Sequence, residues 1–292
     1  MITIYNESCF EINNHLDEDS IDLFFCDPPY YKVVSDKWDN QWNNKDEYLH
    51  WVNQWVSLLY KHMKDYGSGY ICTSWMFSGD YQRIIEENGF CIKNRITWKR
   101  DKGRGSKTNW KSMHEDIWFF TKNDKRYTFN VSDVMVEKEV IAPYRDKNGN
   151  PKDWWVNEDG KKVRLTYPGN IWIDLCIPFW SSKEVRSYAK TKRTPDNLYK
   201  KHSTQKPLDL VKRCIMASSN KDDIVCDMFA GSGTTGIASE QLGRNSVLFE
   251  PNDEYYNIIK TRIKNELKII KDHNSPTLWK KSEKDNFSDF FS

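Results

Sequence analysis

The chain has 292 residues, of which 29% are charged and 14% are aromatic, and its formal net charge is +2. This length allows one large α/β domain with an insertion, or two domains. So small a charge does not by itself indicate a nucleic-acid partner, and no apolar run is long enough to span a membrane. The seven cysteines include no C-x-x-C pair, and no His/Cys cluster has metal spacing. We therefore expect reduced thiols, a cytoplasmic location and no bound metal.

Strands and helices alternate over the first 122 residues. Short apolar runs predict strands at residues 1–5, 21–26, 70–73, 90–98 and 117–121. Helices are predicted at 9–15, 46–63 and 78–88, the second of them from apolar residues at helical spacing. We expect Gly67 and Gly69 to break the chain before the strand at 70–73.

The pattern changes at residue 123 and becomes regular again at 202. Residues 123–201 have no sustained period and several turn signals, which indicates an insertion or a small second module. A helix at 207–218, a strand at 224–226, a helix to about 242, a strand at 246–249 and a helix at 251–271 are predicted next. The predicted units are 1–122, 123–201, 202–272 and a C-terminal appendage at 273–292.

The tetrapeptide Asp27-Pro28-Pro29-Tyr30 directly follows the strand predicted at 21–26. Neither proline can donate a backbone hydrogen bond, and an ionised Asp27 only accepts. Acceptors beside an aromatic ring suit a planar group with N–H donors, such as the amine of a base on which Tyr30 or Tyr31 stacks. A plain strand-to-turn junction is the alternative, because Asp-Pro often begins a turn.

A second motif begins at Asp227, where the strand at 224–226 ends. A glycine turn that contains Gly231, Gly233 and Gly236 opens a helix, and the following strand ends at Glu250. This order is typical of a nucleotide-binding βαβ unit, in which a terminal acid accepts from the ribose hydroxyls. The turn is not a P-loop, because no Lys follows its last Gly, and we expect a nucleoside ligand without a pyrophosphate.

A flexible basic segment separates the strands predicted at 90–98 and 117–121. The segment contains six cations and a single acid, Asp101, and its glycines make it flexible. Contact with nucleic-acid phosphates and a solvated loop are equally good interpretations. The six are Lys99, Arg100, Lys102, Arg104, Lys107 and Lys111.

Three motifs together resemble the permuted "beta" group of S-adenosylmethionine-dependent DNA amino-methyltransferases, of restriction–modification or orphan kind. Residues 229–234, Phe-Ala-Gly-Ser-Gly-Thr, are similar to the cofactor loop of that group, and Asp27-Pro28-Pro29-Tyr30 is similar to its catalytic motif. His202-Ser203-Thr204-Gln205-Lys206-Pro207 resembles a third element that precedes the cofactor loop. The order of catalytic motif, insertion and cofactor motif is also that of the group.

The resemblance implies an α/β, Rossmann-like methyltransferase fold. It would be circularly permuted, with a mostly parallel twisted sheet, helices on both faces and a target-recognition insertion at 123–201. The strand at 21–26 would lie beside the strand at 224–226, with Asp27 and Phe229 at one sheet edge. The group usually has Gly-Asp-Ser/Cys where Asn6-Glu7-Ser8-Cys9 stands, so no cofactor contact is assigned to Glu7.

The resemblance also implies the residues and partners of the site. The catalytic residues would be Asp27, Pro28, Pro29 and Tyr30, and the six cations of the basic segment would bind duplex DNA. The S-adenosylmethionine-binding residues would be Asp27, Thr204, Gln205, Lys206, Asp227, Phe229, Ala230, Gly231, Ser232, Gly233, Thr234, Glu250 and Pro251. A homodimer and a cognate restriction endonuclease remain open as further partners.

Asp at the first position of the catalytic motif, where Ser is the alternative, favours adenine N6 over cytosine N4 as the acceptor. In the implied mechanism the base is flipped out, Tyr30 stacks on it, and Asp27 and the Pro28 carbonyl accept from its amine. The alternatives are a cytosine-N4 DNA methyltransferase, an RNA methyltransferase, or a catalytically silent DNA-binding module.

Overall fold

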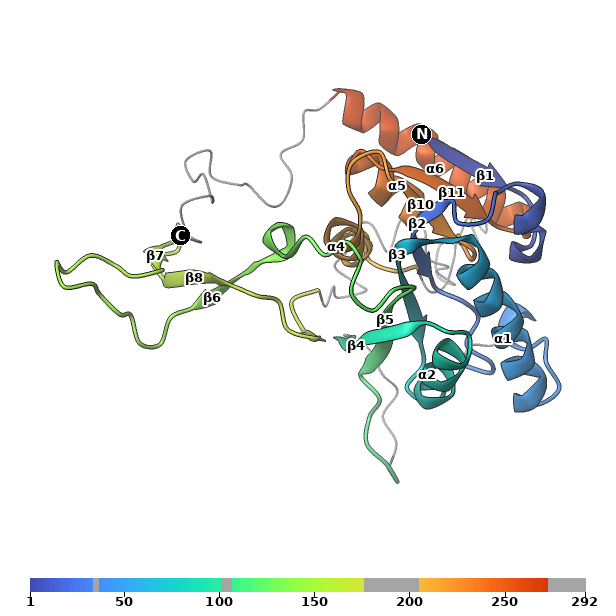
Figure 1. The fold of residues 1–292 in the computed structure, drawn as a ribbon, viewed down its shortest axis with the longest axis horizontal. Helices are drawn as coiled ribbons and strands as arrows, with labels where there is room; N and C mark the ends of the chain where they lie inside the picture. Colours follow the sequence, from blue (N-terminus) through green and yellow to red (C-terminus); the bar gives the residue numbers. More distant parts are fainter. Residues whose placement is uncertain (34–36, 101–106, 176–204, 273–292) are drawn as a thin grey trace, which may run out of the picture.

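The structure is a computed structural model that describes residues 1–33, 37–100, 107–175 and 205–272 (Figure 1). An eight-stranded sheet forms its centre, in the order β1-β11-β10-β2-β3-β5-β4-β9. The first five strands in that order are parallel, and β5 is antiparallel to both β3 and β4. The strands are β1 (Ile2–Tyr5), β2 (Ile21–Cys26), β3 (Met63–Thr73), β4 (Cys91–Lys99), β5 (His114–Thr121), β9 (Ile171–Trp172), β10 (Ile224–Asp227) and β11 (Asn245–Phe249).

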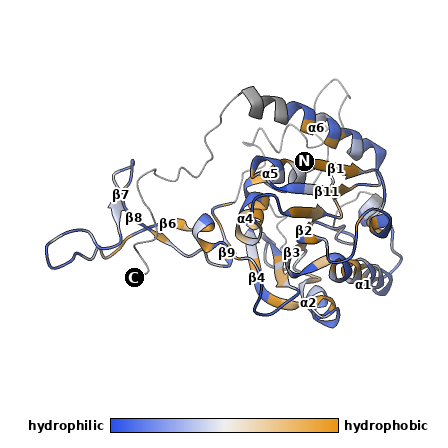
Figure 2. Ribbon diagram, turned by 45° about the horizontal axis from the view of Figure 1, so that its top comes forward, coloured by the Kyte–Doolittle hydropathy of each residue, from blue (hydrophilic) through white to orange (hydrophobic). Residues whose placement is uncertain are grey.

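Helices cover both faces of this sheet (Figures 1 and 2). One face packs against α1 (Lys45–His62) and α2 (Ser78–Glu87), and the other against α4 (Leu208–Ser218) and α5 (Thr234–Gln241). Ile259 of α6 (Asp253–Asp272) packs on Leu248 of β11, on the side of α5. The mostly parallel α/β fold is thus confirmed, while its circular permutation stays a prediction. No described helix is both long and apolar enough to cross a membrane.

Local sequence explains where the main elements lie. Every residue of β2 is buried, as expected for a central strand that is covered on both faces. The α1 helix begins after Asn44, whose side chain accepts a 2.9 Å hydrogen bond from Glu47 N, and it buries Val52, Val56 and Leu59. The helix predicted at 9–15 is instead a 3₁₀ helix, η1 (Cys9–Asn14).

The chain does not break before residue 70, because β3 includes Gly67 and Gly69, although its pairing with β2 is irregular between Met63 and Ser68. These glycines serve close packing and do not form a turn. A Cβ at Gly69 would lie 2.3 Å from Cζ of Phe120, and one at Gly67 would lie 2.5 Å from Cγ of Met63. The phenyl ring of Phe120 therefore occupies the space that a side chain on β3 would need.

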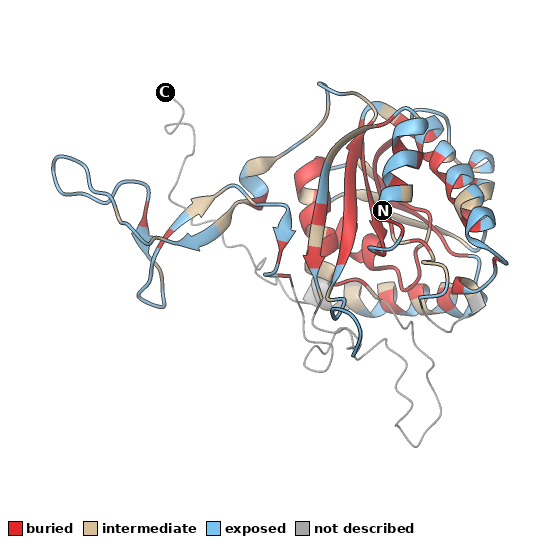
Figure 3. Ribbon diagram, turned by 90° about the horizontal axis from the view of Figure 1, so that it is seen from below, coloured by how far each residue is buried: buried red, intermediate tan, exposed pale blue. Residues whose placement is uncertain are grey.

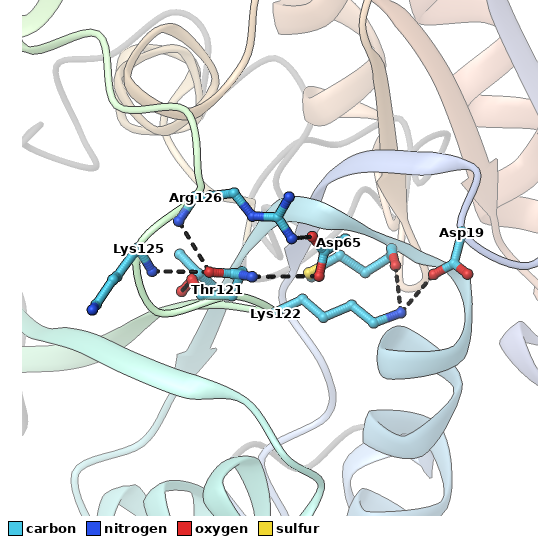
Figure 4. Close-up of polar contacts among 8 residues, drawn as sticks. Asp19, Asp65, Thr121, Lys122, Lys125 and Arg126 are labelled. Carbon is cyan, nitrogen blue, oxygen red and sulfur yellow. Dashed lines mark hydrogen bonds and ion pairs between the residues drawn. The ribbon is translucent and has the colours of Figure 1, made fainter.

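Polar contacts tie the chain together at the edge where β2 and β3 begin and β5 ends (Figure 4). Lys122 donates to Asp19 Oδ1 at 2.6 Å and to the Met63 carbonyl at 2.8 Å. Arg126 forms an ion pair with Asp65, and Asn123 Oδ1 accepts from the backbone N–H of Lys125 at 3.0 Å. Structural contacts therefore occupy this end of the strands, whereas the predicted site residues Asp27 and Asp227 lie at the carboxyl ends of β2 and β10.

The segment expected as an insertion contains a second, three-stranded sheet in the order β6-β8-β7, which projects from the body (Figures 1 and 3). Its strands are β6 (Val136–Glu139), β7 (Trp155–Val156) and β8 (Lys162–Thr166), and η3 (Val131–Val134) precedes them. The sequence predicts none of these strands, because they are short and mostly exposed and so carry little alternation.

Candidate active site

The two sequence motifs meet at one edge of the large sheet. Because β2 and β10 are parallel neighbours, with Cys226 opposite Phe24, their carboxyl ends lie side by side. Asp27 follows the first strand and Asp227 ends the second, as expected. A pocket joins them, lined by Phe25, Asp27, Gln205, Lys206, Val211, Asp227, Phe229, Ala230, Gly231, Ser232, Thr234 and Thr235.

Lys206, just before α4, points at the catalytic motif. Its ammonium lies 2.6 Å from Asp27 Oδ1 and 3.2 Å from the Tyr30 hydroxyl, which itself donates to Asp27 Oδ1 at 2.7 Å. Burial raises the pKa of Asp27, although the ammonium of Lys206 opposes that effect. Burial lowers the pKa of Lys206, but the two acids beside it, Asp27 and Glu115, more than offset this and raise it.

Glu115 is the second acid beside Lys206. It lies in β5, and its Oε2 is 3.2 Å from the Lys206 ammonium. Its Oε1 forms an ion pair with Arg100, which follows β4. Burial would raise the pKa of Glu115, but Lys206 and Arg100 together lower it below its usual range, so the acid is ionised at neutral pH.

The backbone after Tyr30 turns sharply and is held by side chains. Tyr31 and Lys32 have φ values of +37° and +60°, which non-glycine residues rarely adopt. Asp39 stabilises this turn, since its Oδ1 accepts from the Tyr30 N–H at 2.5 Å. The Pro29 carbonyl accepts from the Tyr48 hydroxyl at 2.9 Å.

The glycine turn has the backbone that its sequence suggests. Gly231 and Gly233 have φ values of +54° and +78°, where glycine has no steric cost. A Cβ at Gly233 would lie 2.8 Å from Cγ2 of Ile259. Arg262 of α6 is fully buried and holds the turn from behind, donating to the Ser232 carbonyl at 3.2 Å and to Thr234 Oγ1 at 2.8 Å.

Two buried acids flank this turn. Asp227 accepts from Thr235 Oγ1 at 2.5 Å and from the Phe229 N–H at 2.9 Å. Glu250 follows β11 and accepts from the N–H groups of Gly231 at 2.8 Å and Asn252 at 2.9 Å. Burial raises the pKa of each acid to about 7. Both carboxylates therefore titrate near neutral pH when no ligand is bound.

The structure brings most of the predicted site residues together at this edge. Gln205 accepts from Ser232 Oγ at 3.1 Å, and the Phe229 ring packs on Trp55 with centroids 5.0 Å apart. Pro251 is exposed after Glu250, and Thr204 lies outside the described residues. Tyr31, the alternative stacking residue, packs on Tyr48 with ring centroids 5.5 Å apart.

The basic segment divides into two kinds of residue. Lys99, Lys107 and Lys111 are exposed, as a phosphate contact requires. Arg100 instead turns inward to Glu115. The two remaining cations, Lys102 and Arg104, lie outside the described residues.

Sequence reasoning missed three residues that shape this site: Asp39, Glu115 and Arg262. Glu115 and Arg262 act on the motifs from distant parts of the chain, whereas Asp39 lies nine positions after Tyr30. All three act through contacts that only the fold creates. The one available signal was that charged residues stand in otherwise apolar stretches, as Glu115 does before the run that begins at Ile117.

Comparisons with known proteins agree on one family. Residues 21–261 match the family model for DNA methylases of the N6 and N4 type. Type II methyltransferase M1.MboII of Moraxella bovis is 32% identical over 260 residues, which are 87% of this chain and 93% of that protein. DNA adenine methyltransferase YhdJ of Escherichia coli K12 is 32% identical over 251 residues, 81% of this chain and 74% of that protein. The crystal structure of an M1.HpyAVI–SAM complex matches with a TM-score of 0.57 and 25% identity, over 90% of this chain and 99% of that one.

Proposed function

The chain belongs to the family of N6 and N4 DNA methylases, and from that premise we propose that it transfers a methyl group from S-adenosylmethionine to adenine N6 in duplex DNA. The observation that carries the proposal is the pocket that joins Asp27 and Lys206 to the glycine turn at 231–233. A cofactor held by the turn and a base held by Asp27 would thus share one cavity. The relative named as a DNA adenine methyltransferase and the Asp at the first motif position both favour adenine over cytosine.

The residues present fit this cofactor. Gly231 and Gly233 leave room for a ligand at the turn, and the pocket has carboxylate and hydroxyl groups that suit an amino acid and a ribose. Glu250 would accept from the ribose hydroxyls, while Asp227, Phe229, Ala230, Ser232 and Thr234 would line the methionine part, with Gln205 on the other side. When bound, S-adenosylmethionine supplies an electrophilic methyl group on its sulfonium.

The protein's own groups would orient the target amine. The base must leave the duplex to reach the pocket, because its amine is inaccessible in the stack. Asp27 and the Pro28 carbonyl would accept from the two amine hydrogens, which directs the nitrogen lone pair away from them. Positive charge develops on that nitrogen during transfer, and an ionised Asp27 stabilises it. Tyr30 would contact the ring of the base.

DNA would lie across this edge of the sheet. The exposed Lys99, Lys107 and Lys111 are suitable phosphate contacts, and Lys102 and Arg104 belong to the same segment. We assign target recognition to residues 123–201, which include the projecting sheet. A homodimer, a cognate restriction endonuclease and a cytoplasmic location complete the proposal.

The test is methyl transfer from labelled S-adenosylmethionine to duplex DNA by wild-type protein and by Asp27→Ala. We expect N6-methyladenine from the wild type. The variant should lose at least about 100-fold in kcat, while its cofactor Kd stays within about threefold because Glu250 and the glycine turn are intact. Methylated RNA alone, methylated cytosine, or cofactor binding without any transfer would contradict the proposal. Full activity of Asp27→Ala would refute the role given to Asp27.

A further inference from the structure

The ammonium of Lys206 lies between two buried carboxylates, one of them outside every motif in the sequence. It is 2.6 Å from Asp27 Oδ1 and 3.2 Å from Glu115 Oε2, and the side chains of Lys206 and Glu115 are only 6% and 8% exposed. Arg100 contacts the other oxygen of Glu115. Two carboxylates, one ammonium and one guanidinium sum to zero charge, as a site shielded from water requires.

The proposed reaction makes two opposite demands on Asp27. Asp27 must stay ionised although it is buried, which requires a nearby cation. It must also keep enough negative charge to stabilise the cation that forms on the amine, and an ammonium bound to Asp27 alone would cancel that charge. Glu115 competes for the same ammonium, so both demands are met when Lys206 is shared.

We propose, on the basis of the proposed function, that Glu115 is a positioning residue for methyl transfer: it holds Lys206 between two carboxylates, so that Lys206 fixes Asp27 without neutralising it. Arg100 completes the arrangement. By balancing the charge of Glu115, it prevents Glu115 from drawing the ammonium fully away from Asp27. Arg100 thus acts on Asp27 indirectly, through Glu115 and Lys206, although it belongs to the basic segment.

Other titratable groups also face this cluster. They are Tyr30, Cys72 on β3 and Asp227 on β10. Burial raises the pKa of Tyr30 and of Cys72 well above their usual values, so both stay neutral over the range in which the enzyme is assayed. Burial raises the pKa of Asp227 to about 7, while its hydrogen bonds from Thr235 and from the Phe229 N–H lower it.

The experiment is the pH profile of kcat at saturating cofactor and DNA. Glu115→Gln removes a negative charge that raises the pKa of Asp27, so we expect the acid limb to move to lower pH. The plateau should fall by about tenfold, since Lys206 is then bound to Asp27 alone, while both KM values change by less than about twofold. Arg100→Gln removes a cation, so the acid limb should move to higher pH. A purely structural role would not produce opposite shifts.

Asp116→Asn is the matched control. Asp116 is the next residue of β5, is also buried, and points to the opposite face of the sheet. We expect its pH profile to follow the wild type. An unchanged acid limb in both Glu115→Gln and Arg100→Gln, or the same change in Asp116→Asn, would overturn the inference. If Glu115→Gln does not fold, Arg100→Gln still permits the test, because Arg100 is half-exposed. An acid limb of kcat at the wild-type pH in Arg100→Gln would then overturn the inference by itself. A wild-type protein that methylates no DNA would instead overturn the proposed function.

Discussion

Cofactor binding should depend on the protonation of Glu250. This acid is 6% exposed and, without a ligand, accepts hydrogen bonds from the N–H groups of Gly231 and Asn252. Burial raises its pKa to about 7. An ionised carboxylate accepts from both ribose hydroxyls, whereas a protonated one must donate from one of its oxygens. We therefore expect S-adenosylmethionine to bind the ionised form, and binding to weaken as pH falls below 7.

The size of the effect follows from the raised pKa. With a pKa of about 7, Glu250 is about nine-tenths ionised at pH 8 and about one-tenth ionised at pH 6. If only the ionised form binds, Kd rises about tenfold between these pH values, or about 1.4 kcal/mol. Asp227 also titrates at about pH 7, so the share that belongs to Glu250 has to be isolated by substitution.

Isothermal titration calorimetry with S-adenosylmethionine at pH 6, 7 and 8 measures this dependence. The Glu250→Gln variant should bind more weakly at pH 8 and lose most of the pH dependence, because a glutamine amide does not titrate. Circular dichroism at each pH checks that both proteins are folded. An identical tenfold change in the variant would refute the role of Glu250 and assign the titration to Asp227.

Three further predictions concern the sheet, the glycine turn and the DNA surface. Gly69→Ala should lower the free energy of unfolding in urea by about 1–3 kcal/mol, because its Cβ would overlap the Phe120 ring. Gly79→Ala, where nothing lies within 4 Å, should instead stabilise helix α2 by up to about 1 kcal/mol; equal losses in the two variants would contradict the packing argument. Arg262→Met should weaken cofactor binding about tenfold or more, because it removes the donors to Ser232 and Thr234, and a Kd equal to the wild type would show that the turn holds its shape without them. Lys107→Gln with Lys111→Gln should weaken DNA binding and reduce the slope of log K against log salt by about 2. Lys125→Gln at the opposite sheet edge is the control, and an unchanged slope in the double variant would exclude these lysines as phosphate contacts.

The elements that carry the chemistry were predictable because their signals are local. The buried strand before Asp27 and the glycine turn after Asp227 are both continuous in the sequence, and two adjacent parallel strands with acids at their ends define a site. The course of β3 was not predictable, since glycines usually interrupt strands. Only the position of Phe120 on the neighbouring strand explains Gly69.

The interactions that tune the site were also beyond the sequence. Glu115 and Lys206 are separated by 91 positions along the chain, and Asp39 acts on the backbone of Tyr30 through a turn whose φ values no local pattern predicts. The short strands of the projecting sheet carry too few buried residues to show a period. Long-range charge pairing and exposed strands therefore account for most of what the sequence did not predict.

The most direct test of the proposed methyl transfer is modification-sensitive sequencing of DNA from cells that express this protein, compared with cells that express Asp27→Ala. We expect N6-methyladenine at one short sequence motif with the wild type and none with the variant. N4-methylcytosine at a motif would contradict the choice of base, and the absence of any new DNA methylation would contradict the proposed function itself.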